Sequence, residues 1–421
     1  MMKFGVGQPV ARFEDARLLS GRGRFQDDAN LPGQLYAVFV RSPHAHAAIR
    51  SIDTNAAAAA PGVRAVFTGV DYAADGLSMP KAAMPRKKKD GAPMFAPQRP
   101  ALVIDRVRNV GDPVAMVIAN SLAQAKDAAE LVEVDYEPLP SVTLTADAAR
   151  PNAPRVWDEN PDNISHTYQR GDKAKTEAAF ARADHVVKRR YVVSRVHAQY
   201  MEPRGAIGTY DPGEDRFTLY ADVNYPHRVR NMLANMVFKV PESKVRVVCR
   251  DVGGGFGAKG WQYLEHRLTL WAAKKLGRPV KWSCERSEVL LADEHGRDNV
   301  GEIELALDRD GKFLALRLHM LANIGAYIAS DRQLLTPFGM IGTVVGVYDI
   351  PTAHVSIDAV LSNTSPTAPY RGAGRPEAIY LIERVIEAAA RELGIDAIEL
   401  RRRNIISPDK MPYQTALGPS A

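Results

Sequence analysis

The sequence predicts an α+β protein with a small α/β domain over residues 1–140 and a larger α/β domain over residues 166–421. The first observation behind this prediction is that β-branched runs alternate with helical stretches in both parts. The second is that a proline-rich stretch, residues 141–165, separates the two parts and has the composition of a linker. The third is the length of 421 residues, which allows two or three domains.

The N-terminal part begins with a turn-rich stretch over residues 1–35. Strands are then expected over residues 36–40, 63–68, 114–119 and 131–136, and a short alanine helix over 56–60. A further helix should begin after Ser121, because Ser121 and Gln124 have the spacing of a capping box. These elements predict one small α/β domain that closes near residue 140.

The second part repeats this alternation over a longer stretch. Strands are expected near residues 186–193, 216–221, 245–250, 280–283 and 303–307, with helices near 174–183, 227–236 and 261–276. The apolar residues of 376–393 recur every three to four positions, and Gly394 stands where a helix-ending residue belongs. A long amphipathic helix is therefore predicted before the C-terminal stretch.

The composition is that of an ordinary soluble protein, with 46% hydrophobic and 25% charged residues and a net charge of +6. Two separated cysteines, Cys249 and Cys284, cannot hold an iron–sulfur cluster or form a disulfide scaffold. No apolar run reaches 18 residues and no signal sequence is visible, so we expect a cytoplasmic protein without a membrane span. The basic run at residues 86–89 is predicted to be a solvated surface loop, and no nucleic-acid partner is expected.

A glycine loop is the most informative feature of the chain: residues 253–258 read GGGFGA, between a predicted strand and a predicted helix. Such a loop can turn successive backbone N–H groups toward an anion beside the positive end of a helix dipole. The predicted ligand is a phosphate, pyrophosphate or oxo-anion, and the alternative is a tight turn without a ligand. A NAD fingerprint is a weaker interpretation, because the segment about 20 residues further on holds Lys274 and Lys275 instead of an acid.

A second loop of similar chemistry lies at residues 369–377, where Arg371 and Arg375 bracket the run Gly-Ala-Gly at 372–374. Arginine forks bind phosphates and oxo-anions through two parallel hydrogen bonds. The alternative is a helix entry with solvent-exposed arginines.

Three further groups of polar residues suggest structural roles. His44 and His46 form a pair without a third ligand, so hydrogen-bonded histidines beside a strand are expected there instead of a metal site. Residues 293–295, Asp-Glu-His, are expected to form a polar surface turn. Glu202 and Arg204 are expected to form either an ion pair or a buried structural contact.

Taken together, these motifs resemble the molybdenum-binding large subunit of the xanthine dehydrogenase and aldehyde oxidase family, in the branch like the aerobic carbon monoxide dehydrogenase large subunit. The resemblance rests on the two loops and on VGQPV at 6–10, GRGRFQDD at 21–28, RSPHAHA at 41–47, VGDPVA at 110–115 and MEPRG at 201–205. It extends over essentially the whole chain. It implies an α/β hammerhead domain over residues 1–140 and the first molybdopterin-binding domain over 166–421.

The resemblance also implies roles for individual residues. The cofactor-binding residues are expected to be Asn224, Gly254, Gly255, Phe256, Gly257, Arg371, Gly372 and Ala373. Arg371 would be the catalytic loop arginine, and Asn224 stands where the family usually has a glutamine. No side chain would ligate the metal, since the pterin dithiolene holds the molybdenum.

The cofactor that the family implies is molybdopterin with molybdenum, expected in the cytosine dinucleotide form. A 2Fe–2S cluster and FAD would lie on partner chains, an Fe–S small subunit and an FAD medium subunit. Purine-oxidising members have a glutamate where this chain has Gly260, and carbon monoxide oxidisers have a cysteine where it has Gly372. The expected substrate is therefore an aldehyde or an aromatic heterocycle.

Members of the family run to about twice this length, and their final domain carries the catalytic glutamate that acts as general base. The sequence thus predicts a truncated, frameshifted or naturally split large subunit that lacks the second molybdopterin-binding domain and that depends on a separate C-terminal half. The alternative is a cofactor-less or inactive binding or assembly module of the same fold. An NAD-binding oxidoreductase is the third choice.

Overall fold

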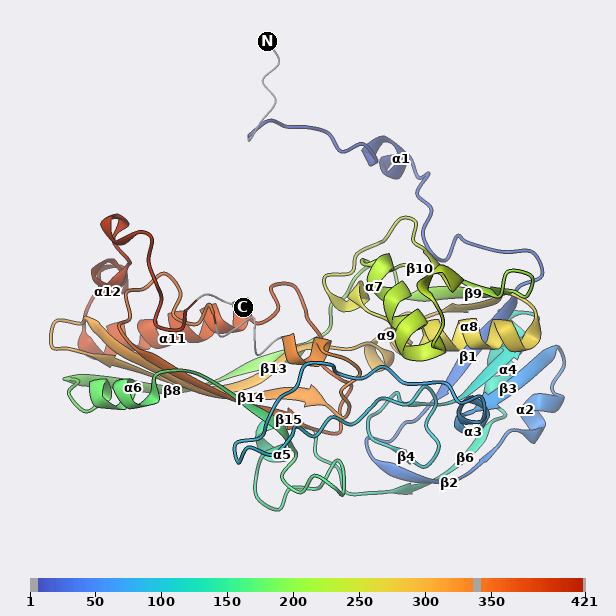
Figure 1. The fold of residues 1–421 in the computed structure, drawn as a ribbon, viewed down its shortest axis with the longest axis horizontal. Coiled ribbons are helices and arrows are strands. Elements are labelled where there is room, and N and C mark those ends of the chain that lie inside the picture. Colours follow the sequence, from blue (N-terminus) through green and yellow to red (C-terminus); the bar gives the residue numbers. More distant parts are fainter. Residues whose placement is uncertain (1–6, 336–341, 419–421) are drawn as a thin grey trace, which may run out of the picture.

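The computed structural model describes residues 7–335 and 342–418 as a mixed α/β structure (Figure 1). The strands are β1 (Leu35–Arg41), β2 (Ala47–Asp53), β3 (Val63–Thr68), β4 (Arg106–Val107), β5 (Pro113–Ala119), β6 (Glu133–Pro138), β7 (Ile164–Gly171), β8 (His185–Val196), β9 (Gly205–Asp211), β10 (Arg216–Ala221), β11 (Val245–Val248), β12 (Val280–Ser283), β13 (Gly296–Leu307), β14 (Phe313–Gly325) and β15 (Ala353–Leu361). The helices are α1 (Asp15–Leu19), α2 (Asn55–Ala59), α3 (Gly69–Ala74), α4 (Leu122–Ala129), α5 (Thr145–Ala148), α6 (Lys173–Phe180), α7 (Pro226–Asn231), α8 (Leu264–Leu276), α9 (Arg286–Ala292), α11 (Arg375–Leu393) and α12 (Ala397–Asn404). Shorter helical turns are η1 (Met232–Phe238), η2 (Glu242–Lys244), η3 (Ala258–Gly260) and η4 (Pro408–Lys410).

A seven-stranded sheet combines strands that precede the predicted linker, residues 141–165, with strands that follow it. Its order is β11-β10-β9-β12-β1-β5-β3. Strand β1 pairs with β5 on one side and runs parallel to β12 on the other, with Leu35 opposite Val280. Phe39 packs edge-on against Trp282, with 5.9 Å between the ring centroids. Helix α8 packs against β9, β10 and β12 over the same core. The N-terminal strands therefore complete a sheet that carries the glycine loop at its other end.

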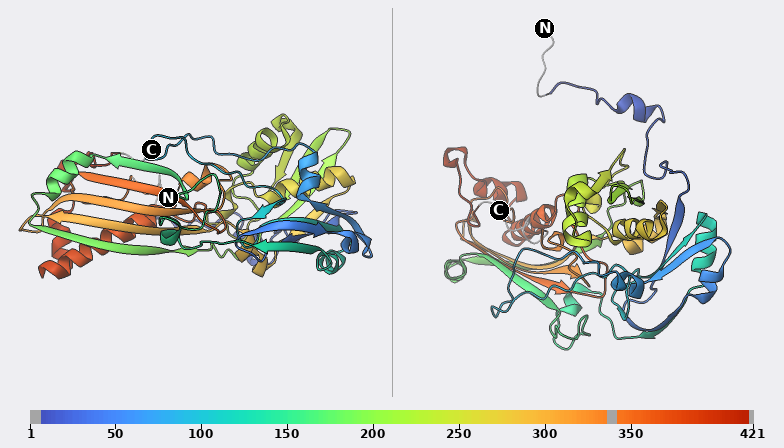
Figure 2. Two further views of the ribbon diagram at one scale, coloured as in Figure 1. Left: turned by 90° about the horizontal axis from the view of Figure 1, so that it is seen from below. Right: turned by 45° about the vertical axis from the view of Figure 1, so that its right-hand side comes forward.

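A five-stranded sheet, in the order β7-β15-β14-β13-β8, forms the other large layer (Figure 2). Alternation along β14 sorts its side chains between two faces. Leu318 and Met320 point into an apolar core with Ile382 and Val385 of α11. The opposite face is more polar, and there Arg317 forms ion pairs with Glu304 and, on α6, with Glu177.

A small three-stranded sheet, β4-β2-β6, completes the N-terminal region. Helix α4 packs on β1 and β5, and it begins as expected because the Ser121 hydroxyl accepts a hydrogen bond from the Gln124 amide. The predicted long helix is also present as α11, and Gly394 follows it with a φ of +64°. The predicted helix over 227–236 is divided between α7 and the π-helical turn η1.

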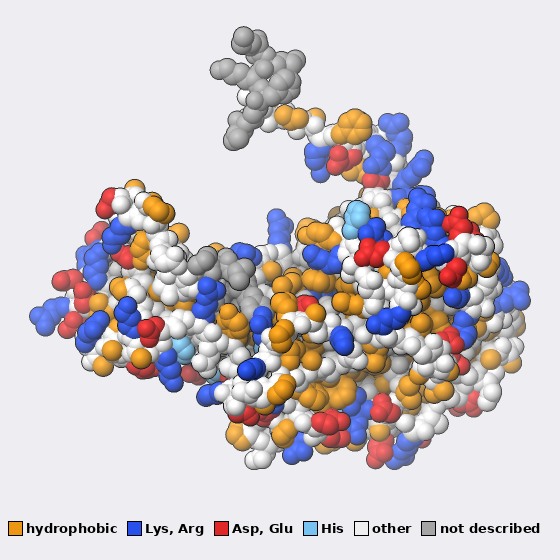
Figure 3. All heavy atoms as spheres, viewed as in Figure 1, with side chains coloured by type: hydrophobic (Ala, Val, Ile, Leu, Met, Phe, Trp, Pro, Cys, Tyr) orange, Lys and Arg blue, Asp and Glu red, His pale blue; other side chains and the backbone are white. Residues whose placement is uncertain are grey.

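The described N-terminal segment, residues 7–24, extends away from the body and carries α1 (Figures 1 and 3). Basic side chains gather along it, among them Arg12, Arg17 and Arg22. Arg17 ties the segment to the body through a double hydrogen bond to Asp251, two residues before the glycine loop begins; one of the two bonds measures 2.6 Å. Among the described residues, no helix is both long and apolar enough to cross a membrane.

Candidate functional site

The glycine loop after β11 and the arginine loop before α11 lie against each other. The Arg371 amide donates a 2.9 Å hydrogen bond to the Phe256 carbonyl oxygen. An open hollow of about 440 Å³ lies between the loops, lined by Phe256, Gly257, Pro369, Tyr370, Arg371, Gly372 and Ala373. The structure thus brings together two motifs that the sequence presents far apart.

Glycine at position 257 is required for this close approach. Its φ of +106° is one that L-residues rarely adopt, and a Cβ atom there would lie 2.2 Å from the Pro369 carbonyl oxygen. Phe256 and Ala373 also have positive φ angles, 48° and 45°. Positive φ at two non-glycine residues that face each other across a hollow is the kind of local strain that clusters at functional sites.

Asn224 adjoins the same loop. A Cβ atom on Gly255 would lie 2.2 Å from the Asn224 Oδ1 atom, so the side-chain amide lies directly against the loop backbone. The backbone amide of Asn224 donates a 2.9 Å hydrogen bond to the Lys259 carbonyl oxygen. The residues that the family resemblance assigns to the cofactor therefore form one contiguous group; their roles stay predictions.

Several backbone N–H groups of this site have no hydrogen-bond acceptor in the part of the chain that the structure describes. Within residues 7–335 and 342–418, the amide groups of Gly254, Gly255, Phe256 and Gly257 donate no hydrogen bond to a protein acceptor, and neither does that of Gly372. Unpaired successive N–H groups in a glycine loop are suited to an anionic group. The donor set thus fits a phosphate-bearing or oxo-anionic cofactor.

Arg371 is exposed, and its guanidinium carbon lies 5.8 Å from the centroid of the Phe256 ring. Arg297, a residue that the sequence analysis missed, holds the arginine loop in place. Arg297 donates to the Arg371 carbonyl oxygen at 2.7 Å and to the Glu377 carboxylate at 2.8 Å. Because Glu377 is buried, this ion pair fixes the start of α11 and with it the arginine loop.

The prediction of a polar surface turn at residues 293–295 was wrong. Asp293 and Glu294 are buried, because buried arginines neutralise them. Arg204 donates to Asp293 at 2.6 Å and to Glu265 at 2.9 Å, and Arg332 pairs with Glu294. Charged residues are buried only where counter-charges reach them, and here the counter-charges come from arginines that are distant in the sequence.

Two other polar contacts are structural. Glu202 and Arg204 do not pair with each other: Arg204 reaches Asp293 and Glu265, whereas the Glu202 carboxylate accepts a 2.7 Å hydrogen bond from the Gly253 amide.

His46 is buried and donates from Nδ1 to the Pro140 carbonyl oxygen at 2.8 Å. His44 packs its ring against Tyr136 at 5.0 Å between centroids.

Burial of His295 predicts a pH effect on stability. Burial lowers the pKa of His295 to about 4, and the charge of Arg195 adds to this effect. In the unfolded chain the pKa is about 6.5, so between pH 6.5 and 4 the unfolded state binds more protons and the folded state loses stability as the pH falls. His295→Gln should flatten this decline by up to about 1.4 kcal/mol per pH unit, measured by urea unfolding at several pH values.

His319 supplies the matched control of opposite sign. Its hydrogen bond to Asp358 raises its pKa, so its contribution is present below pH 6.5 and is lost as the pH rises above that value. His319→Gln should therefore leave the decline between pH 6 and 4 in place. A His295→Gln profile parallel to that of the parent chain across this range would contradict the assignment.

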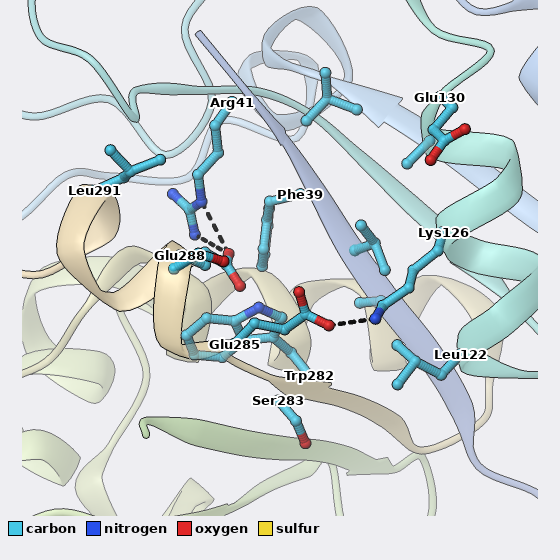
Figure 4. Close-up of a pocket in the computed structure, with 15 residues that line it drawn as sticks. Phe39, Arg41, Leu122, Lys126, Glu130, Trp282, Ser283, Glu285, Glu288 and Leu291 are labelled. Atoms are coloured by element: carbon cyan, nitrogen blue, oxygen red, sulfur yellow. Dashed lines mark hydrogen bonds and ion pairs between the residues drawn. The ribbon is translucent and has the colours of Figure 1, made fainter. Parts of the chain in front are cut away.

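A separate hollow of about 400 Å³ lies on the seven-stranded sheet between α4 and α9 (Figure 4). Phe39 and Trp282 form its apolar floor, and the ion pair between Lys126 and Glu285 spans it. It shares no lining residue with the hollow between the two loops.

Two family models match the chain. Residues 156–405 match the molybdopterin cofactor-binding domain, and residues 20–140 match the aldehyde oxidase and xanthine dehydrogenase a/b hammerhead domain. The hammerhead match ends at residue 140, and the seven-stranded sheet joins strands from before and after that position.

Relatives of known reaction are similar over nearly the whole chain. The carbon monoxide dehydrogenase large chain of Afipia carboxidovorans is 37% identical over an alignment of 428 positions, which covers 98% of this chain and 51% of that protein. The crystal structure of quinoline 2-oxidoreductase from Pseudomonas putida 86 superposes with a TM-score of 0.89 at 36% identity, over 100% of this chain and 52% of that one. The nicotinate dehydrogenase large molybdopterin subunit of Eubacterium barkeri is 29% identical over 402 residues, 95% of this chain and 89% of that subunit. The chain thus spans about half the length of the first of these relatives.

Proposed function

Because this chain belongs to the family of molybdopterin-binding large subunits with an aldehyde oxidase and xanthine dehydrogenase hammerhead domain, we propose that it forms the loop-bearing half of a molybdenum hydroxylase large subunit. One observation supports this proposal most strongly. The glycine loop contacts the arginine loop, and backbone N–H groups without a protein acceptor lie beside this contact. A bound molybdenum cofactor supplies two-electron oxidation of a C–H group with oxygen that derives from water.

The residues of this chain would hold and orient that cofactor. The amides of residues 254–257 would donate to its anionic groups, and Asn224 would offer its side-chain amide beside them. Arg371, Gly372 and Ala373 would close the opposite side, and Arg371 would place a positive charge near the reacting atoms. The general base is assigned to no residue of this chain.

For the substrate we propose an aldehyde or an aromatic heterocycle. Gly260 is buried and carries no side chain at the position where the family resemblance implies an acid in purine oxidisers, and a Cβ atom there would touch the ring of Tyr225 at 3.4 Å. Gly372 leaves no thiol for carbon monoxide chemistry. The names of the quinoline and nicotinate enzymes among the relatives support heterocycles.

Electrons would leave through an Fe–S small subunit and an FAD medium subunit, since Cys249 and Cys284 are free cysteines and cannot bind a cluster alone. Large apolar side chains are exposed along the C-terminal region, namely Val347, Ile379, Ile398, Ile405 and Met411. We also propose that this face packs against the second half of the large subunit. The cytosine dinucleotide form of the cofactor and a cytoplasmic location remain predictions.

Arg371 supplies the test of this proposal. In the complex co-purified with its partner chains, Arg371→Ala should lower dye-linked oxidation of benzaldehyde or quinoline by about 10²-fold or more, because it removes a charge near the reacting atoms. Arg384→Ala, which removes an exposed arginine of α11 that packs on Tyr191 and Tyr380, is the matched control and should keep the parent rate. Enzyme-like turnover of xanthine or carbon monoxide by the complex would contradict the proposed substrate class.

A further inference from the structure

A buried charge cluster lies beneath the glycine loop and is formed by Lys259, Glu202 and Asp222; it is called the lysine cluster below. The Lys259 side chain is 0% exposed, and its ammonium group forms an ion pair with Asp222. The same group donates to the Glu202 carboxylate at 3.1 Å and to the Glu202 carbonyl oxygen at 2.7 Å. The ring of Tyr200 lies 4.4 Å from Nζ. Burying an ammonium group costs free energy, which carboxylates and hydrogen bonds of this kind offset.

The lysine cluster is connected to both ends of the glycine loop. At the start, the Gly253 amide donates to the Glu202 carboxylate at 2.7 Å, and the Glu202 amide donates to the Gly253 carbonyl oxygen at 3.2 Å. At the end, Lys259 directly follows the loop, and its carbonyl oxygen accepts from the Asn224 backbone amide at 2.9 Å. One cluster therefore fixes the beginning of the loop, its end and the neighbouring Asn224.

The cluster also ties the loop to the rest of the fold. Asp222 follows β10 directly and accepts a 3.0 Å hydrogen bond from the Gly205 amide at the start of β9. Glu202 accepts a further 2.9 Å hydrogen bond from the Gln26 amide, two residues after the N-terminal segment. The loop is thus anchored to the seven-stranded sheet through side-chain charges, in addition to its own backbone contacts.

We propose that Lys259, held by Glu202 and Asp222, is the positioning residue of the glycine loop: it sets the conformation in which the amides of residues 254–257 stay unpaired and the loop meets Arg371. The part of this inference that concerns molybdenum cofactor retention rests on the proposed function. The part that concerns loop conformation stands on the geometry of the chain alone.

The first test measures hydrogen–deuterium exchange of the purified chain. Lys259→Met keeps an apolar stem of similar length and removes the charge, so the Asn224, Gly253 and Arg371 amides should exchange about tenfold faster or more, because each of these amides depends on the loop geometry. The Arg371 amide is the decisive reporter, because it lies on the other loop and touches no residue of the cluster. Unchanged exchange at Arg371 in Lys259→Met would overturn the inference.

Lys281 offers a matched control. It is also a buried lysine, with Nζ donating to the Asp27 and Ala29 carbonyl oxygens at 2.8 and 3.0 Å, but it anchors the turn before β1 to β12. Lys281→Met should leave the Arg371 amide at its parent exchange rate. If Lys259→Met does not fold, Glu202→Gln provides the second variant: it removes the charge that faces Gly253 and should accelerate the same three amides. Equal acceleration of Arg371 in Lys281→Met would reduce the effect to general destabilisation and overturn the inference.

The second test measures pterin retained by the co-purified complex. Lys259→Met should retain at least about tenfold less pterin than the parent, Lys259→Arg should restore part of it, and Lys281→Met should retain the parent amount. If the parent complex carries no pterin while the exchange pattern is as expected, the proposed function fails and the positioning role stands. If the parent carries pterin and Lys259→Met retains all of it, the positioning role is overturned while the proposed function stands.

Discussion

Arg204→Met is expected to lower the free energy of unfolding by about 3–5 kcal/mol, because it removes a buried counter-charge that two buried carboxylates share. Arg204 is 1% exposed and bridges Asp293 and Glu265, both 0% exposed at their side chains. Burial alone would raise the pKa of Glu265, yet Arg204 and Arg41 hold it far below its ordinary value. The guanidinium also lies 3.8 Å from the ring of Tyr263, so packing is lost together with charge.

Arg317→Met is the matched control for this prediction. Arg317 also pairs with two carboxylates, Glu177 and Glu304, but its side chain is 30% exposed and the pairs are screened by water. Its loss should cost less than about 1 kcal/mol. Urea unfolding at pH 7 measures both, and a loss in Arg204→Met no larger than that in Arg317→Met would show that the buried network does not hold the core together.

Gly257→Ala is expected to abolish cofactor retention. The φ of +106° is strained for alanine, and the new Cβ atom would collide with the Pro369 carbonyl oxygen at 2.2 Å, so the two loops must move apart. The hydrogen bond from the Arg371 amide to the Phe256 carbonyl oxygen would break with this movement. Pterin analysis of the co-purified complex should show a loss of at least about tenfold, which corresponds to about 1.4 kcal/mol of binding free energy.

The control for the glycine variant is Gly277→Ala at the end of α8. Gly277 also has a positive φ, 62°, but nothing lies within 4 Å of a Cβ atom placed there. Gly277→Ala should therefore cost about 1–2 kcal/mol of stability through backbone strain and retain the cofactor. Equal pterin content in the two variants would show that the contact between the loops is unimportant for binding.

The sequence located the two loops that the structure brings together, whereas it predicted the sheets incompletely. The two loops are recognisable because glycine and arginine at close spacing have few other uses, and the long helix α11 shows its period over several turns. The strands β2, β4, β7, β9, β14 and β15 were not predicted, and only the second part of β13 was. Strand β14 is apolar on one face and mixed on the other, so its run FLALRLHMLANIG has neither a clear period of two nor a clear helical period.

The contacts that hold the site could not be predicted, because they join residues that are distant in the chain. Nothing near Arg297 in the sequence indicates that it reaches the Arg371 carbonyl oxygen and Glu377. The pairing of β1 with β12 likewise depends on tertiary structure, so a composition boundary near residue 140 does not show that the sheet continues across it. The burial of Asp293 follows from Arg204, which lies on a different element.

The most direct test of the proposed function is the molybdenum and pterin content of the chain purified together with the products of its neighbouring genes. The proposal predicts close to one molybdenum atom and one pterin for each copy of the chain, and loss of both in Gly257→Ala. A well-folded complex that contains neither, although the same cells load another molybdenum enzyme fully, would contradict the proposal and would favour a binding or assembly module of the same fold.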